Sequence, residues 1–244
     1  MISKILFLDL DGEFNKWINI YFNGINGIEC ETMRVKNYKP SSSERVAYMS
    51  PLNNTGIMDS GIDLEYNLVM FRNINITVKK KIFETANYLK SKNVKMPPEM
   101  NMASPYLSVG SSLLIPIEGT MHYLIGAPTL SNNDVYNDTP KNAYYAFKAV
   151  FKLLHNYIRC FGEHKIDTLI VPALCCGSSC ASPKESAHEI FTAYFDCVMG
   201  MDNDKPLYVT PSIYLFKTDE YMTTEKLIEL NKKNSEYLGI SYEG

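Results

Sequence analysis

The sequence predicts a three-layer α/β/α fold in which helices cover both faces of a mixed central sheet. Short apolar segments alternate along the chain with longer segments of helical periodicity, and this alternation is typical of a layered α/β protein. A chain of 244 residues can bury a substantial core, and neither an internal repeat nor a convincing linker divides it. We therefore expect one domain over residues 1–244, with a core at about 1–220 and a C-terminal helix at about 223–238.

The first half of the chain is predicted to contain three strands and two helices. The apolar stretch KILFLDL (Lys4–Leu10) indicates a buried strand, and Asp11 can cap the helix that follows it. Two further strand candidates, GIECETMRV and ERVAYMS, are separated by a loop rich in proline and serine. The segment VKKKIFETANYLKSK carries apolar residues at helical spacing and predicts the second helix.

The second half is predicted to continue with a hairpin, a long helix and another strand–helix pair. The stretch SSLLIPIEGTMHYLIGAPTL is typical of a hairpin that turns near Glu118-Gly119. A continuous apolar stripe from Lys141 to Cys160 predicts a helix, and IDTLIVPAL predicts a buried strand. The next helix has a strong start signal, because Ser182 and Glu185 can form a capping box. The stretch PSIYLFKT is the last strand expected.

Composition and charge limit the classes of binding partner that we expect for this protein. The formal net charge is -3 and the sequence pI is about 5.9, so we expect no general binding to nucleic acid or to an anionic membrane. No apolar run approaches the roughly 20 residues that span a bilayer. The N-terminus is too soon acidic for a secretory signal, and six cysteines without such a signal favour a reducing compartment. The expected location is therefore intracellular, either cytoplasmic or nuclear.

The stretch VPALCCGSSCASPKES (Val171–Ser186) concentrates three cysteines and can be interpreted in three ways. A cysteine phosphatase needs an arginine six positions after its nucleophile, but Ala181 and Ser182 occupy those positions. Zinc is a second option, because Cys176 and Cys180 have a permitted spacing, although the four histidines do not cluster in sequence. The third option is a backbone site, in which loop N–H groups and a helix N-terminus bind a phosphate or diphosphate. We favour the third option and assign no metal site.

A second informative loop, VAYMSPLNNTGIMDSGID (Val46–Asp63), becomes polar and glycine-containing directly after an apolar strand. Asn, Gly and Asp are frequent in such places for turn geometry alone, and a solvated loop is the simplest interpretation. Ligands of open α/β sheets nevertheless bind outside the carboxyl ends of the strands, which is where this loop begins. The loop is therefore a second candidate site.

Together, the two loops resemble those of macro domains, the family that binds ADP-ribose. SPLNNTGIMDSGID resembles the family's Asn-x-Ala-Asn motif with its glycine-rich stretch and Val-Asp pair, and VPALCCGSSCASPKES resembles its diphosphate loop and following helix. Between them, YLIGAPTL and NAYYAFKAVFKLL are similar to a subgroup with an Ala-Pro-Thr strand and an aromatic-rich helix. The resemblance covers about residues 1–220 and implies a macro-domain-like fold.

The resemblance also implies roles for individual residues. Asn53 matches the asparagine that orients the distal ribose, and Asp63 matches an acidic residue that positions or activates water; these two are the expected catalytic residues. The remaining residues expected to bind ligand are Ser50, Asn54, Gly56, Asp59, Gly61, Ile62, Leu174, Cys175, Cys176, Gly177, Ser178, Ser179, Cys180 and Phe216. The first loop departs from the family in reading Asp59-Ser60-Gly61 where consecutive glycines are common.

Two functions follow from the resemblance as expectations. The first is hydrolysis, without metal or cofactor, of a mono-ADP-ribosyl ester, O-acetyl-ADP-ribose or ADP-ribose 1''-phosphate. The second is a reader module that binds ADP-ribose or an ADP-ribosylated partner without cleaving it, an option that the altered first loop keeps open. A module that has lost the pocket, and a redox or zinc site on the cysteine loop, are the remaining alternatives.

Overall fold

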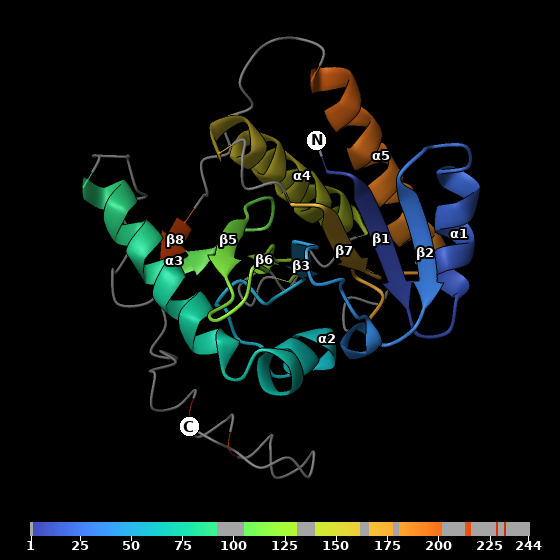
Figure 1. The fold of residues 1–244 in the computed structure, drawn as a ribbon. Coiled ribbons are helices and arrows are strands. Elements are labelled where there is room, and N and C mark those ends of the chain that lie inside the picture. Colours follow the sequence, from blue (N-terminus) through green and yellow to red (C-terminus); the bar gives the residue numbers. More distant parts are fainter. Residues whose placement is uncertain are drawn as a thin grey trace.

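The computed structural model describes residues 2–91, 105–130, 140–161, 166–177, 181–201 and 213–215, together with positions 228 and 232. These residues form a mixed α/β structure with helices on both faces of a central sheet, as Figure 1 shows. The predicted three-layer α/β/α fold is thereby confirmed. Positions 228 and 232 are helical, and the rest of the C-terminal helix predicted at about 223–238 lies outside the described residues.

The central sheet of the described structure has six strands in the order β2-β1-β7-β3-β6-β5. Its strands are β1 (Lys4–Asp9), β2 (Ile28–Thr32), β3 (Val46–Ser50), β5 (Leu113–Pro116), β6 (Tyr123–Gly126) and β7 (Thr168–Pro172). Neighbouring strands are parallel except β5 and β6, which form the predicted antiparallel hairpin. Because β1, β7, β3 and β6 are parallel, their carboxyl ends meet at one edge of the sheet.

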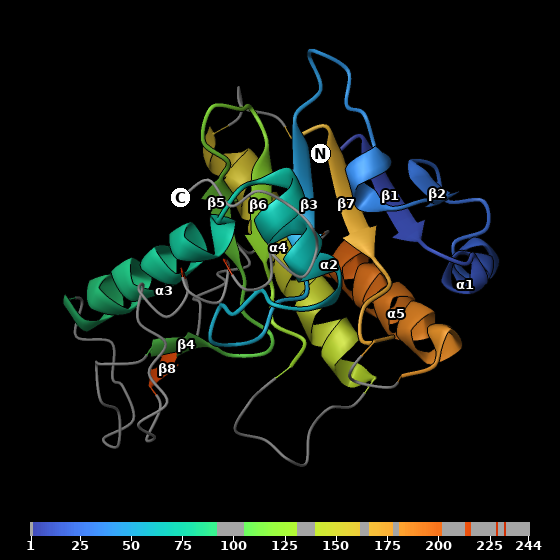
Figure 2. The ribbon, with the colours of Figure 1, turned by 90° about the horizontal axis from the view of Figure 1, so that it is seen from below.

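Two helical layers bury the sheet. One layer consists of α1 (Glu13–Tyr21), α4 (Lys141–Phe161) and α5 (Pro183–Met201). The other consists of the short turn η1 (Val35–Asn37), α2 (Gly61–Leu64), the π-helical segment η2 (Glu65–Met70) and α3 (Ile74–Ser91). Figures 1 and 2 show the two layers on opposite sides of the strands.

Apolar side chains on both faces of β1 explain why helices pack against both sides of the sheet. Ile5 and Phe7 belong to the core under α1, α4 and α5, whereas Leu6 and Leu8 belong to the core under η2 and α3. All four are buried, as expected for a strand covered on both faces. Phe7 lies with its ring centroid 6.0 Å from that of Phe14 in α1, so one strand residue helps to anchor the first helix.

The start of α1 differs from the prediction, whereas the last predicted strand is present. Asp11 is not the N-cap residue of α1; Gly12 takes that place with φ 86°, and Asp11 accepts a hydrogen bond from the Glu13 amide. Asp9 adds a second bond to the helix start by accepting from the Phe14 amide at 2.8 Å. The strand predicted in PSIYLFKT is present as β8 (Ile213–Leu215), and it pairs with β4 (Pro105–Leu107) beside α3 and not with the central sheet, as Figure 2 shows.

A further helical segment was not predicted from the sequence. The segment Gly61–Met70 is helical. Within the described ranges, no helix is long and apolar enough to cross a membrane.

Candidate functional site

The two loops singled out in the sequence leave the same edge of the sheet. β3 and β7 are neighbouring parallel strands, with Tyr48 paired with Ile170 in register. The loop after Ser50 and the loop after Pro172 therefore begin side by side. β1 flanks β7 on its other side, so the start of α1 lies at the same edge. This edge is where open α/β sheets bind ligands.

Ser50 and Asp63 form the most enclosed polar contact of the first loop. The Ser50 hydroxyl donates a hydrogen bond of 2.6 Å to Oδ1 of Asp63, across 13 residues of chain. Ser50 ends β3 and is fully buried, and Asp63 lies in the first turn of α2 with 9% of its surface exposed. The fold thus brings together two residues that the sequence analysis placed in the site.

The surroundings of Asp63 favour its protonated form. Burial raises the pKa of the Asp63 carboxyl, the hydrogen bond from Ser50 opposes that rise, and the nearby carboxylate of Asp59 adds to it, with a resulting pKa of about 7. An ordinary aspartate titrates about three pH units lower. Asp63 can therefore take up or release a proton near neutral pH, which is the property required of a general acid or base.

Tyr66 is a buried neighbour of Asp63 and is anchored to β3. Its hydroxyl donates to the Met49 carbonyl oxygen at 3.2 Å, and its ring stacks on Phe71 at a centroid distance of 5.7 Å. Burial raises the pKa of the Tyr66 phenol, and the charge of Asp63 raises it further, so this hydroxyl stays protonated. Sequence reasoning missed Tyr66, because its contact with Met49 depends on how η2 packs against β3.

Asn53 is held within its own loop. Its side-chain oxygen accepts hydrogen bonds from the amide and the hydroxyl of Thr55 at 2.9 Å and 2.8 Å, which is the geometry of an Asx turn. The backbone of Asn53 forms a parallel bridge with Leu130, which follows β6. Its neighbour Asn54 is buried, and the Leu107 amide donates to the Asn54 carbonyl oxygen at 2.8 Å. Hydrogen bonds within the protein therefore fix the conformation of this part of the first loop.

Helix α3 supports the same loop from below. A Cβ added to Gly56 would lie 3.0 Å from Ile82 Cδ1, so this glycine packs against α3. Nζ of Lys79 donates to the Thr55 carbonyl oxygen at 3.2 Å, and burial lowers the pKa of Lys79 to about 8. The sequence did not single out Lys79, because it begins a run of three lysines that is typical of a solvated helix face.

The last residues of the first loop lie near the surface. Asp59 and Gly61 are exposed and Ile62 is half-buried at the start of α2. Gly61 has φ 55°, and no atom lies within 4 Å of where its Cβ would be. A substrate could reach this segment, in contrast to Gly56.

The cysteine loop is tied to α5 through Leu174. The Leu174 carbonyl oxygen accepts hydrogen bonds from the Ser186 hydroxyl at 2.6 Å and from the Cys176 thiol at 3.3 Å. Cys175 is buried with φ 58°, and its carbonyl oxygen accepts from the Ala181 amide at 3.0 Å. Gly177 is exposed. The predicted ligand-binding residues Ser178, Ser179, Cys180 and Phe216 lie outside the described residues.

The described cysteines carry thiols that are at least partly buried. None of Cys30, Cys175, Cys176 and Cys197 forms a disulfide in the described structure. Burial raises the pKa of Cys176 to about 11, an effect that Ser186 opposes and that Asp9 and Asp11 strengthen. The Cys176 thiol is therefore un-ionised at neutral pH and a poor nucleophile. Among the residues that the structure describes, no group of three or more His, Cys, Asp or Glu side chains is arranged to hold a metal ion.

The predicted capping box at the start of α5 is present. The Ser182 hydroxyl accepts from the Glu185 amide at 3.2 Å, and the Ser182 amide donates to the Glu185 carboxylate at 3.0 Å. These bonds satisfy donors at the helix start. The Ser182 hydroxyl also donates to the Glu185 carboxylate at 2.7 Å, and this bond, with the one from the Ser182 amide, lowers the pKa of the exposed Glu185 carboxyl.

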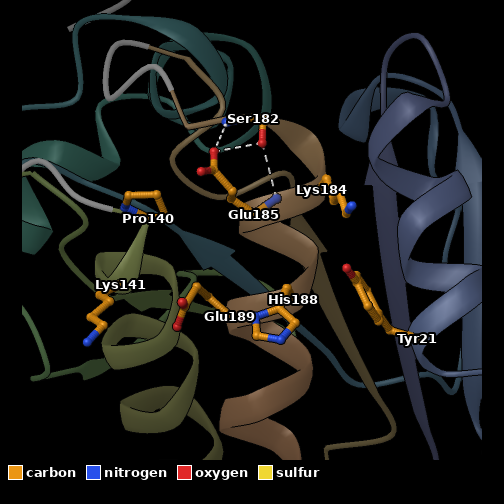
Figure 3. A pocket seen from close by; sticks show the side chains of 8 residues that line it. All are labelled: Tyr21, Pro140, Lys141, Ser182, Lys184, Glu185, His188 and Glu189. Carbon is orange, nitrogen blue, oxygen red and sulfur yellow. Dashed lines mark hydrogen bonds between the residues drawn. The ribbon is translucent and has the colours of Figure 1, made fainter.

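An open pocket of about 750 Å³ extends from the capping box along α5, between α1 and the start of α4. Figure 3 shows its lining, which consists of Tyr21, Pro140, Lys141, Ser182, Lys184, Glu185, His188 and Glu189. Its two lysines are matched by two glutamates, so the lining has no excess charge for an anion at neutral pH. Lys184 also lies over the Trp17 ring, with Nζ 4.9 Å from the centroid. The two loops at the sheet edge are therefore the stronger candidate site.

Comparison with solved structures found similar proteins. No family model matches the chain, and no curated protein matches it. A solved structure of a protein of unknown function from Bacteroides thetaiotaomicron is similar to 78% of this chain and 90% of that chain, with 13% sequence identity and a TM-score of 0.36.

Proposed function

We propose that this protein binds ADP-ribose or a derivative of it at the shared edge of β3 and β7 and hydrolyses that ligand. The substrate would be a mono-ADP-ribosyl ester, O-acetyl-ADP-ribose or ADP-ribose 1''-phosphate, and the proposed reaction uses a carboxyl group without metal or cofactor. The observation that carries the proposal is the buried carboxyl of Asp63, which has a pKa of about 7 and lies at the sheet edge where the cysteine loop begins.

The two loops have different roles in this proposal: the cysteine loop binds the diphosphate, and the first loop provides the catalytic carboxyl group. Backbone N–H groups of Cys175, Cys176 and Gly177, together with the start of α5, would hold the diphosphate, because backbone amides and a helix N-terminus attract anions. Asp63 in its ionised form would accept a proton from the attacking water, and the loop amides would stabilise developing negative charge. Gly61 and Ile62, at the accessible start of α2, would lie against the distal ribose.

Turnover by matched variants tests the catalytic part of the proposal. Asp63→Asn keeps the shape of the side chain and removes its ability to accept a proton. General base catalysis contributes about 10²- to 10⁴-fold, so we expect a rate loss of that order on the preferred substrate. Asp196→Asn is the control, because Asp196 lies on α5 in a surface contact with Lys148. Full turnover by Asp63→Asn on all three substrate types would overturn the hydrolytic mechanism.

A non-catalytic reader of ADP-ribose is the second candidate, and the geometry of Asn53 favours it. The side-chain oxygen of Asn53 already accepts two hydrogen bonds from Thr55, which leaves it less available to orient a ribose hydroxyl. Calorimetry with ADP-ribose separates the two functions when it is paired with the turnover assay. Tight binding without product supports the reader, and absence of binding argues against both.

A further inference from the structure

Ser50 lies too deep to contact a ligand. Its side chain is fully buried at the end of β3, beneath the first loop. Its hydroxyl is directed at Asp63, with 2.6 Å between Oγ and Oδ1. Ser50 is predicted from the sequence to bind ligand, but in the structure its effect on a ligand must pass through Asp63.

We propose that Ser50 is a positioning residue, whose buried hydroxyl fixes Oδ1 of Asp63 and leaves Oδ2 as the carboxyl oxygen that meets water or substrate. In the described part of the chain, Ser50 is the hydrogen-bond donor to this carboxyl group. A carboxyl group held at one oxygen keeps the other in a fixed direction, which is the orientation that proton transfer requires. The last step, transfer to a substrate, rests on the proposed function.

Ser50 also sets the pH at which Asp63 ionises. The groups that face Asp63 are the carboxylate of Asp59 in the same loop and the phenol of Tyr66 in η2, which itself contacts Tyr48 of β3 at a centroid distance of 6.0 Å. Asp59 and burial both disfavour the ionised carboxyl, whereas the Ser50 hydroxyl favours it. Removal of the hydroxyl should therefore raise the pH at which Asp63 releases its proton.

A direct titration of Asp63 tests this inference without any substrate. The full-length protein is labelled with ¹³C at the aspartate carboxyl groups, and Asp63→Asn identifies the Asp63 signal by its loss. In Ser50→Ala the midpoint should rise by about one pH unit, the equivalent of one hydrogen bond to a charged group. In Ser50→Thr, which keeps the hydroxyl, the midpoint should stay within about 0.3 units of the wild-type value.

A second variant guards against a failure of Ser50→Ala to fold. Ser50→Cys has a similar size and a weaker donor, so its midpoint should lie above that of the wild type. An unchanged midpoint in whichever of the two variants folds would overturn the inference. Where turnover is measured, the acidic limb of kcat/KM should move to higher pH together with the midpoint.

The outcomes also separate this inference from the proposed function. A midpoint that rises in Ser50→Ala, together with a wild-type protein that turns over none of the three substrates, would support the role of Ser50 and contradict the hydrolase. A midpoint in Ser50→Ala equal to that of the wild type, together with loss of turnover in Asp63→Asn, would support the hydrolase and contradict the role of Ser50.

Discussion

Gly56 and Val78 are in such close contact that a methyl group added to Gly56 would crowd the Val78 side chain. A Cβ on Gly56 would lie 3.2 Å from Val78 Cγ1 and 3.0 Å from Ile82 Cδ1, and Gly56 also has φ 79°. The first loop therefore packs directly against α3 at Gly56. This contact joins the candidate site to the helical layer that contains α3. Gly61 has a similar backbone conformation, with φ 55°, but has open space around it.

This difference predicts unequal costs for two alanine substitutions. Gly61→Ala should lower the free energy of unfolding by about 1–2 kcal/mol, the cost of a left-handed conformation. Gly56→Ala should lower it by about 1–3 kcal/mol more, because the new methyl group overpacks a buried contact. Urea unfolding of both variants measures the two costs. Equal destabilisation would contradict the packing role of Gly56.

Asp63→Asn should stabilise the protein at neutral and alkaline pH. The folded protein has an Asp63 pKa of about 7, raised from 3.8, so the native state binds the proton more tightly than the unfolded chain. The stability from this group is complete below about pH 4 and is lost as the pH rises to about 7. Between pH 5 and pH 8, wild-type stability should fall by about 3 kcal/mol relative to Asp63→Asn.

Urea unfolding of the two proteins at both pH values checks this prediction, and Asp196→Asn serves as the control for removal of an exposed carboxylate. A stability difference that does not change with pH would show that Asp63 ionises normally. A variant that is more stable but inactive would fit a site whose strain serves its function.

Cys176 should react slowly with iodoacetamide. Its pKa of about 11 lies two pH units above the ordinary thiol value of 9.0, so the reactive thiolate is about 100-fold less abundant at pH 8. Mass spectrometry of the native protein and of the urea-unfolded chain compares the two rates at this residue. Faster alkylation in the native protein would revive a thiol function for the cysteine loop.

Ser182→Ala should destabilise the start of α5. Loss of an N-cap hydroxyl costs about 1 kcal/mol, and here the hydroxyl both accepts from the Glu185 amide and donates to the Glu185 carboxylate. Ser182→Thr keeps these bonds and is the matched control. Thermal unfolding should place Ser182→Ala below both the wild type and Ser182→Thr, and no difference would show that the cap contributes nothing.

Local patterns in the sequence were sufficient for much of the fold. The hairpin near Gly119, the helix from Lys141 and the capping box at Ser182 were all predicted and are present. Each depends on residues close together in the chain, where periodicity, turn residues and caps act directly. The helical segment after Gly61 was missed, because its conformation depends on packing against β3 and α3.

The sequence by itself determined most of the strands and helices, in their order, and the two loops that follow buried strands. Only the tertiary structure decided that β8 lies outside the central sheet, that Lys79 is buried beneath the first loop, and that Ser50 meets Asp63. These features arise from contacts between residues distant in sequence, whose burial sets their pKa values. Neither burial nor distant contact can be read from spacing along the chain, whereas helix caps and hairpins can.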